Sequence, residues 1–534
     1  MRHHPVDKSS SSWSGNALWL HLLLLMLAGS DAAAHLELLR VPYLQNGSHT
    51  NITIRWRTDV ATDSRVRYGT NLANLTLTNS GIIAVSDHEV VLQQLKPDTK
   101  YFYAVGNATT TLAGGDTNHF FVTSPSPGTV KNTRIWVLGD PGTTGVGQTS
   151  VRDAYETFTG VRHTDLWLML GDNAYNNGTD SEYQYGLFDI YTNMLRKSVL
   201  WPALGNHDTA QATAFVDTYP YFDIFTLPKN GEVGGVASGT EHYYSFDYAN
   251  IHFICLDSMT AGRATNNAMY LWLTNDLANI TATWTIAYWH HPPYTKGSHD
   301  SDYETELIEM REVFLPVLEQ AGVDLVLAGH SHCYERSFLL DHHYRDSTTF
   351  NSSMKLDAGS GRENDTGAYR KNLFDPDAHQ GTVYAVLGSS GQASGGTFNH
   401  PAMRVSFGQL GSLVLDININ RLDATFLRET GATNDTFTIL KTSSTSTLRI
   451  VSQTLNPMRH CTITWSSVGG LRYRVSFRDG NPNGAFTDIV RSAILETDAA
   501  PNGRASVQSF TDDFTLTGGA STSEARYFRV RVIP

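Results

Sequence analysis

Apolar and polar positions change their periodicity twice along the chain, and each change predicts a new kind of structure. Residues 35–125 alternate, as in NITIRWR, where Ile52, Ile54 and Trp56 share one face. SRVRYGT and HEVVLQQL alternate in the same way. Strict alternation between turn residues is typical of half-buried β-strands. The pattern predicts an all-β sandwich of short strands over residues 35–125.

One turn in this region has a specific form. In LKPDTKYFY, a turn with Pro97 and Thr99 leads into a strand on which Tyr101 and Tyr103 share a face. The segment resembles the corner of a fibronectin type III sandwich, in which a tyrosine hydroxyl bonds back to the preceding turn. SPSPG at residues 124–128 then predicts a linker.

From Thr133 the pattern changes to short apolar runs that end in Gly-Asp or paired polar residues. These runs are TRIWVLGD, DLWLMLGD, WTIAYWHH and DLVLAGH. Residues 302–320 have helical apolar spacing at Leu307, Met310 and Phe314, and Gly322 follows as a helix stop. Apolar strands alternating with helices predict an α/β layered domain, which we place at residues 131–442.

Alternation returns in the last part of the chain. LRIVSQT, CTITW, LRYRVSFRDG and ARYFRVRVIP alternate between turns rich in Gly and Asn. Residues 446–534 are therefore predicted to form a third, smaller β-sandwich. The fold class expected from the pattern is multidomain, with an α/β layered domain between N-terminal and C-terminal all-β sandwiches.

The first 34 residues do not fit any of these domains. Positive residues near the start precede an apolar run over residues 17–28, and small residues follow at positions 30–34. This is the pattern of a secretory signal peptide, and the apolar run is shorter than the roughly 20 residues that span a bilayer. We therefore expect no membrane span and a secreted or extracellular protein, periplasmic if the source is bacterial. Three cysteines allow at most one disulfide.

The charge of the chain excludes one class of partner. Its formal net charge is −13 at pH 7, and no basic stripe interrupts the acidic background. A nucleic-acid-binding surface needs clustered Lys and Arg to neutralise phosphates. Nucleic acid is therefore not an expected partner.

The ends of the apolar runs carry metal-competent side chains. In open α/β sheets, loops at the carboxyl ends of strands converge on one crevice. Each motif alone is common, but the ordered set at glycine-marked strand ends predicts a metal site. Mixed oxygen and nitrogen ligands in this number suit a pair of ions that share a carboxylate. The set comprises Asp140 in GDPG, Asp172 and Tyr175 in GDNAY, Asn206 and His207 in GNHD, His290 and His291 in WHHPP, and His330 and His332 in GHSH.

This ordered set resembles the purple acid phosphatases, within the calcineurin-like metallophosphoesterase superfamily. The resemblance extends over roughly residues 36–442 and includes GHSHCYERS, which is similar to the plant-type sequence. It implies a metallophosphoesterase domain with a ferric ion and a divalent ion, Zn, Mn or Fe. In that arrangement Asp140, Tyr175 and His332 hold Fe(III), Asn206, His290 and His330 hold the divalent ion, and Asp172 bridges them.

Three positions depart from the family pattern. Ala287 stands where the fourth motif usually opens with valine, and Asp208 ends the GNH motif where plant-type members have glutamate. The family has two histidines after the fourth motif that help to bind substrate. Here His299 occupies the first position and Asp300 the second. That difference bears on the range of substrates.

The expected mechanism is attack of a metal-bound hydroxide on a phosphate ester, with a histidine donating a proton to the leaving oxygen. His207, oriented by Asp208, is the first candidate donor, and His299 is the second. We expect His291 to be structural, and Cys333 to point away from the ions because neighbouring side chains of an extended segment alternate.

Three functions are compatible with the sequence. The first is a secreted acid phosphatase acting on small phosphate monoesters. The second is a phosphodiesterase or nucleotide pyrophosphatase that uses the same metal core. The third is a non-catalytic surface-binding protein, which has no need for a complete ligand set.

Overall fold

The computed structural model describes most of the chain beyond the predicted signal peptide. The described residues are 36–211, 215–372, 379–442, 448, 450–468, 472–480, 483–489, 505–521 and 525–533. The signal peptide predicted at residues 1–34 lies outside them. Among the described residues, no helix is long and apolar enough to cross a membrane.

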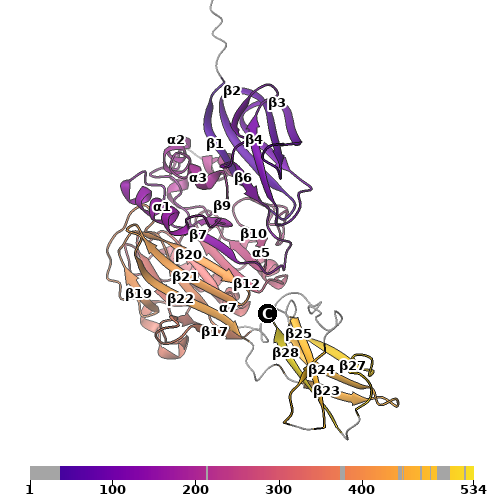
Figure 1. Ribbon diagram of the computed structural model, residues 1–534. Helices are drawn as coiled ribbons and strands as arrows, with labels where there is room; N and C mark the ends of the chain where they lie inside the picture. Colours follow the sequence, from indigo (N-terminus) through magenta and orange to yellow (C-terminus); the bar gives the residue numbers. More distant parts are fainter. Residues whose placement is uncertain are drawn as a thin grey trace, which may run out of the picture. The chain divides into compact units, whose positions relative to one another are not determined.

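The N-terminal strands form one six-stranded sheet in the order β1-β2-β4-β5, with β3 on β2 and β6 on β4 (Figure 1). The strands are β1 (Leu38–Gln45), β2 (Ile52–Gly69), β3 (Leu77–Leu92), β4 (Lys100–Gly106), β5 (Thr111–Gly114) and β6 (Phe120–Val122). NITIRWR and SRVRYGT were expected to be separate short strands, but both belong to the 18-residue strand β2. The strand continues through the polar residues between them, although its pairing with β3 is irregular there, with register shifts between Arg57 and Thr62 and between Thr62 and Ser64.

The predicted tyrosine corner is present. The Tyr101 hydroxyl accepts a hydrogen bond from the Lys96 backbone N–H at 3.0 Å, so the strand is tied back to its own turn. The Tyr103 hydroxyl donates to the Arg196 carbonyl oxygen at 2.9 Å, which connects this sheet to the central part of the chain.

The central part contains two seven-stranded mixed sheets, as the α/β prediction required. The first has the order β17 (Tyr369–Asn372), β22 (Thr433–Thr442), β21 (Arg421–Arg428), β20 (Gly411–Asn418), β7 (Thr133–Leu138), β8 (Leu166–Met169), β9 (Val199–Pro202). The second has the order β10 (Tyr244–Tyr248), β11 (Ile251–Cys255), β12 (Trp284–Trp289), β13 (Leu325–Ala328), β18 (Val383–Val386), β14 (Tyr334–Ser337), β19 (Met403–Phe407). Strands β7, β8 and β9 run parallel, and so do β11, β12, β13 and β18.

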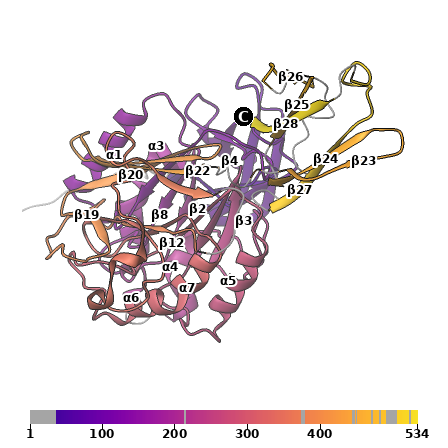
Figure 2. The same ribbon diagram turned by 90° about the horizontal axis from the view of Figure 1, so that it is seen from below.

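One hydrophobic core contains side chains from both sheets. Trp136, Trp167 and Trp201 from the first sheet and Trp284 from the second are all buried in it. Helices cover the other face of the second sheet (Figure 2), where Leu273 of α5 and Phe314 share a second core with strand residues. Two layers of sheet with helices outside are the arrangement that buries strands on both faces.

The helices and remaining short elements lie in the loops between these strands. The predicted helix at residues 302–320 is observed as α6 (Thr305–Glu309), the π-helical segment Met310–Phe314 and α7 (Leu315–Gln320). The others are α1 (Val146–Thr159), α2 (Asp180–Tyr183), the π-helical segment Gln184–Phe188, α3 (Thr192–Leu195), α4 (Pro220–Ile224) and α5 (Ala268–Ala278), with 3-10 turns at His207–Thr209, Val216–Thr218, Ser347–Thr349 and Ser352–Met354, and strands β15 (Leu339–Leu340) and β16 (Lys355–Asp357).

The C-terminal region contains two three-stranded sheets with a core of their own. One is β23 (Ile450–Leu455), β24 (Cys461–Val468) and β27 (Ala505–Asp512), and the other is β26 (Thr487–Asp488), β25 (Arg472–Asp479) and β28 (Arg526–Ile533). Trp465 of β24 and Tyr473 of β25 meet in this core. All three cysteines are buried and free. The domain boundaries at residues 35–125, 131–442 and 446–534 stay predictions.

Candidate metal centre

Parallel strands of both central sheets end at the same place and bring the predicted ligands together. Asp140 follows β7, Asp172 follows β8 and Asn206 follows β9 in the first sheet. His290 follows β12 and His330 follows β13 in the second. These motifs are far apart in the sequence but close in space, because neighbouring parallel strands end at the same edge of a sheet.

The first group of donor atoms surrounds the Tyr175 hydroxyl. This hydroxyl lies 2.9 Å from Asp172 Oδ2, 3.2 Å from Asp140 Oδ1 and 3.2 Å from His332 Nε2. His332 Nε2 is 3.6 Å from Asp140 Oδ1. A phenol, an imidazole and two carboxylates thus meet at one point, which is the donor set that the family resemblance implies for a ferric ion.

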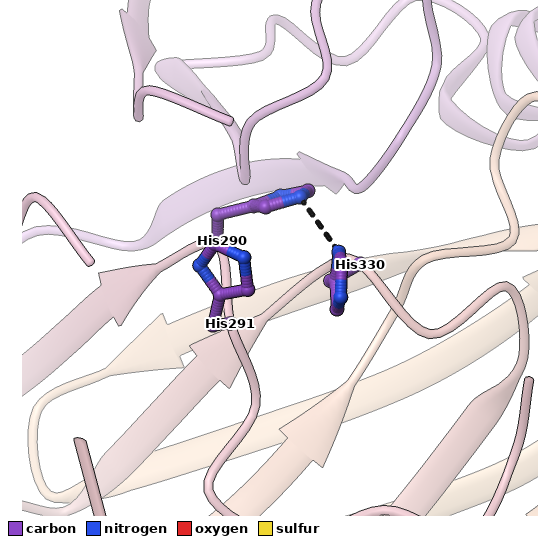
Figure 3. Close-up of side chains that lie close together, drawn as sticks. All are labelled: His290, His291 and His330. Carbon is purple, nitrogen blue, oxygen red and sulfur yellow. Dashed lines mark hydrogen bonds between the residues drawn. The ribbon is translucent and has the colours of Figure 1, made fainter. Parts of the chain in front are cut away.

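The second group surrounds the side-chain oxygen of Asn206. This oxygen lies 2.9 Å from His290 Nε2 and 3.0 Å from His330 Nδ1, and the two nitrogens are 3.2 Å apart (Figure 3). Ligand atoms at bond lengths of about 2.1 Å around one ion lie about 3 Å apart. The three atoms fit the ligand shell of one divalent ion.

Asp172 contacts both groups. Its Oδ2 accepts the hydrogen bond from Tyr175, and its Oδ1 lies 3.5 Å from His290 Nε2. The His207 backbone N–H donates to Oδ1 at 2.8 Å and fixes the carboxylate between the groups. This is the position that a carboxylate bridging two ions requires.

The backbone is strained where these ligands are presented. Asp140, Asp172 and His330 have φ angles of 54°, 51° and 66°, in the left-handed region that residues with a Cβ rarely adopt. Such conformations cost on the order of 1–3 kcal/mol each and cluster at functional sites. The fold holds three ligands in conformations that stability alone does not favour.

Two motif glycines leave room for ligand oxygens. A Cβ at Gly205 would lie 2.3 Å from Asp172 Oδ1, and one at Gly329 would lie 2.4 Å from Asp140 Oδ2. Both distances are well inside van der Waals contact. The glycines of the GNHD and GHSH motifs are therefore needed for close approach of backbone to carboxylate.

The charges of the centre favour a cation. Burial and the carboxylates of Asp140 and Asp172 raise the pKa of the Tyr175 hydroxyl far above its usual range. Burial would raise the pKa of Asp140, but the imidazoles of His290, His332 and His330 outweigh it and lower that pKa. A phenolate beside two carboxylates is stable only when positive charge balances it, so the donor set fits metal ions.

Hydrogen bonds outside the donor set orient the histidines. His290 Nδ1 is 2.8 Å from the Leu170 carbonyl oxygen, so it carries the proton and leaves Nε2 free to bind an ion. His330 Nε2 is 3.3 Å from Glu304 Oε2, which leaves Nδ1 free in the same way. No motif in the sequence identifies Glu304. It lies in the loop before α6, and the tertiary fold brings its side chain to His330.

His207 lies at the centre, but Asp208 does not orient it. His207 Nδ1 is 2.7 Å from the Asn176 carbonyl oxygen, and its ring lies 4.3 Å from that of Tyr175. The Asp208 carboxylate instead accepts from Asn173 Nδ2 at 2.9 Å and from the Tyr183 hydroxyl at 2.6 Å. The predicted pairing of Asp208 with the His207 ring is wrong, because adjacent residues of this 3-10 turn point in different directions.

The observed role of Asp208 is to fix the loops that carry the ligands. It is fully buried and also accepts from the Gly205 N–H at 2.8 Å, beside Asn206. Burial and the neighbouring Asp172 carboxylate raise the pKa of Asp208 to about 7. Asp208 joins the GNHD loop to the GDNAY loop and is not a group that meets substrate.

His299, the second candidate proton donor, also lies at the centre. Its ring is 3.8 Å from the His330 ring, and its Nδ1 is 2.9 Å from Glu304 Oε2. Asp300, at the position of the second family histidine, is bound by Lys296 Nζ at 2.5 Å. The Asp300 carboxylate is therefore held in an ion pair.

His291 and Cys333 lie next to proposed ligands and make hydrogen bonds to other residues. His291 Nδ1 is 2.9 Å from the Ser258 hydroxyl, although its ring is near His290 and His330 (Figure 3). The Cys333 thiol lies 3.7 Å from Glu335 Oε2 and 3.4 Å from the Ser331 hydroxyl. Both side chains are buried, and a structural role for His291 stays a prediction.

Comparisons with known proteins agree with this geometry. A family model described as calcineurin-like phosphoesterase matches residues 133–334, and one described as purple acid phosphatase, N-terminal domain, matches residues 41–123. These matches and the site define a calcineurin-like metallophosphoesterase with an N-terminal domain of the purple acid phosphatase kind. In both of these regions the chain is similar to the purple acid phosphatases.

Individual relatives have the same family name. The chain is 32% identical over 295 residues to purple acid phosphatase 15 of Arabidopsis thaliana, and 28% identical over 266 residues to purple acid phosphatase 1 of Ipomoea batatas. The matches cover 48% and 47% of this chain, and 50% and 51% of the relatives. The chain thus spans about half the length of each relative. A yellow lupin (Lupinus luteus) purple acid phosphatase has the same fold, with a TM-score of 0.57, 17% identity and 75% of each chain covered.

Proposed function

We propose that this chain is a secreted acid phosphatase that hydrolyses small phosphate monoesters at a centre of Fe(III) and a divalent ion, Zn, Mn or Fe. The observation that carries the proposal is the division of the predicted ligands into two groups that share Asp172. The matches to the two family models support the reaction class, and the Tyr175 hydroxyl within the first group supports the ferric assignment.

Each residue has a defined place in the proposed centre. Asp140, Tyr175 and His332 would hold Fe(III), while Asn206, His290 and His330 would hold the divalent ion. Bound ions would supply the positive charge that binds phosphoryl oxygens and acidifies water. The first position is surrounded by two carboxylates and one phenol, which suit a hard trivalent cation. The second position is richer in nitrogen and suits Zn, Mn or Fe(II).

His207 is the proposed proton donor to the leaving oxygen. Its Nδ1–H donates to the Asn176 carbonyl oxygen, so the ring is held and Nε2 is the atom left to meet substrate. A protonated ring offers Nε2–H, and donation of that proton avoids an alkoxide leaving group. His299 is the second donor, and its contact with Glu304 keeps it beside His330.

The test compares two substrates on metal-loaded protein. We expect p-nitrophenyl phosphate to be hydrolysed faster than bis(p-nitrophenyl) phosphate, with activity extending to acidic pH. A preference for the diester would favour the alternative of a phosphodiesterase or nucleotide pyrophosphatase. No hydrolysis of either compound by protein that holds its ions would overturn the proposal and favour a non-catalytic surface-binding protein.

A variant pair separates the proposed donor from a structural histidine. His207→Ala should lower kcat by about 10²–10⁴-fold, the usual contribution of a general acid, while ion content is unchanged. His49→Ala, in the N-terminal sheet region, serves as the control. Rates that fall equally for esters with good and poor leaving groups would contradict proton donation by His207.

A further inference from the structure

A second cluster of metal-ligating side chains lies outside the proposed centre. It consists of Asp341, His342 and His379, whose ligand atoms all lie within 4.8 Å of one another. His379 Nδ1 is 2.9 Å from Asp341 Oδ1, and His342 Nδ1 is 2.8 Å from Asp341 Oδ2. The two imidazole rings are stacked with centroids 4.2 Å apart. Two nitrogens from distant segments thus converge on one carboxylate.

The backbone of the cluster is held in place by Glu319, a buried residue near the end of α7. Its Oε2 accepts the His342 N–H at 2.8 Å, and its carbonyl oxygen accepts the His379 N–H at 3.1 Å. The hydroxyls of Tyr344 and Tyr384 each donate to the same carboxylate at 2.6 Å. Glu319 therefore fixes both histidines relative to each other.

Both histidines adopt an unusual backbone conformation to reach Asp341. Their φ angles are 65° for His342 and 69° for His379, in the left-handed region. Residues with a Cβ occupy this region rarely, and ligand sites are among the places where they do. The left-handed conformation of both histidines is therefore consistent with a ligand site at this position.

The hydrogen-bond pattern favours a positive charge inside the cluster. His379 Nε2 is 3.0 Å from the side-chain oxygen of Gln320, to which it can only donate. A neutral ring with that proton presents a lone pair at Nδ1 to the Asp341 carboxylate. Two acceptors at 2.9 Å need either a second proton or a cation between them.

We propose that Asp341, His342 and His379 form a divalent-cation site of the zinc class, separate from the dinuclear centre. Two imidazoles and one carboxylate with an open fourth position are ligands that Zn²⁺ accepts. Asp341 is buried, whereas the His342 side chain is 60% exposed, so solvent has access from one side. An ion there would fasten the end of α7, the segment after β15 and the segment before β18.

The experiment measures bound Zn²⁺ per chain after equilibrium dialysis, in the full-length protein and in the variants His342→Asn and His379→Asn. We expect each variant to retain one ion fewer than the parent. We also expect Zn²⁺ to raise the melting temperature of the parent more than that of either variant. Hydrolysis of p-nitrophenyl phosphate should stay unchanged, since neither residue lies at the dinuclear centre. The result is the difference in bound ions between the parent and each variant, so it does not depend on how fully the dinuclear centre is occupied.

A matched control distinguishes the cluster from an ordinary histidine–carboxylate pair. His119 Nδ1 lies 3.0 Å from Asp116 Oδ1, but no second imidazole joins that pair among the described residues. His119→Asn should keep the full ion count. Equal ion counts and equal responses to Zn²⁺ in the parent, His342→Asn and His379→Asn would overturn the proposal and leave a doubly protonated His379 as the bridging charge.

Discussion

Tyr175 shows how one side chain narrows the chemistry of a site. Its hydroxyl is within hydrogen-bond reach of Asp140, Asp172 and His332, three of the proposed ligands. Two carboxylates oppose loss of its proton, so a phenolate here depends on a neighbouring cation. A general metallophosphoesterase needs no phenol at this position, whereas a ferric site can use one.

Replacement of Tyr175 by Phe tests the ferric assignment. A phenolate on Fe(III) absorbs visible light by charge transfer, so Tyr175→Phe should remove the colour of the iron-loaded protein. The check is the visible absorption spectrum at equal iron content, with Tyr185→Phe as control because that ring is 61% exposed. If the band persists in Tyr175→Phe, the phenolate assignment is wrong.

Glu304 is the residue that the sequence did not identify. Its carboxylate bonds to both His299 and His330. Glu304→Gln keeps the size but removes the charge, and loss of such a partner typically lowers metal affinity or activity by about 10–100-fold. Competition dialysis for the divalent ion is the measurement. Glu306→Gln on α6 should leave the affinity unchanged, and an equal loss there would argue against a specific role for Glu304.

The β-strands of the two central sheets position the proposed ligands, and glycines after these strands let the backbone come close to the ligand carboxylates. Strand ends with Gly-Asp, Gly-Asn and Gly-His could be found in the sequence because buried strands and tight turns have local patterns. The contact made by Asp208 could not be found, since it depends on the direction of a side chain in a 3-10 turn. The length of β2 was also missed, because the strand continues through polar residues that break the apolar alternation in the sequence.

Gly205→Ala tests the close approach at the GNHD motif. The added methyl would meet Asp172 Oδ1 and displace the proposed bridge, so we expect loss of bound ions while the far-ultraviolet circular dichroism spectrum is kept. Metal analysis of purified protein is the measurement. Gly395→Ala is the control, because nothing lies within 4 Å of its Cβ position. Normal ion content in Gly205→Ala would contradict the prediction and show that the loop can move to accommodate the methyl group.

A buried histidine links strands to helix α5 and gives stability a pH dependence. His252 on β11 lies 2.7 Å from Asp247 of β10 and 2.9 Å from Asp276 of α5. Burial would lower the pKa of His252, but the two carboxylates outweigh it and raise that pKa to about 9. The charged form is favoured by folding, so its contribution is complete below pH 6.5 and is lost as pH rises through 9.

The size of this effect follows from the shift. About 1.4 kcal/mol per pKa unit gives on the order of 3 kcal/mol between pH 6 and pH 10. Urea unfolding of the parent and of His252→Asn at both values is the measurement. We expect the difference in unfolding free energy to shrink at pH 10. An equal difference at both values would show that His252 stabilises through packing alone.

At the scale of the molecule, two arginines of the N-terminal sheet attach it to the central part. Arg40 Nη2 is 3.1 Å from Asp180 Oδ1, and Arg57 Nη1 is 2.5 Å from Asp180 Oδ2. Arg40 is buried, whereas Asp180 is nearly half exposed. One carboxylate on α2 thus pairs with two guanidinium groups of the sheet.

Asp180→Ala should therefore weaken this attachment. Removal of one partner from a buried pair costs about 3–5 kcal/mol, and solvent at Asp180 reduces the expected loss to about 1–2 kcal/mol. The measurement is the free energy of unfolding in urea. Asp153→Ala, which removes an exposed carboxylate paired with its neighbour Arg152, should cost less than about 0.5 kcal/mol. Equal losses in the two variants would mean that Asp180 contributes only a surface ion pair.

The proposed ligands come from both central sheets, and this has a consequence for the stability of the protein. Asp140, Tyr175 and Asn206 lie in loops after strands of the first sheet, and His290, His330 and His332 lie in loops after strands of the second. With all three thiols free, no disulfide crosses these layers. Each ion of the proposed centre would therefore act as a coordinate cross-link between the layers. A chelator that removes the ions would then abolish the proposed catalysis and this cross-link in the same step.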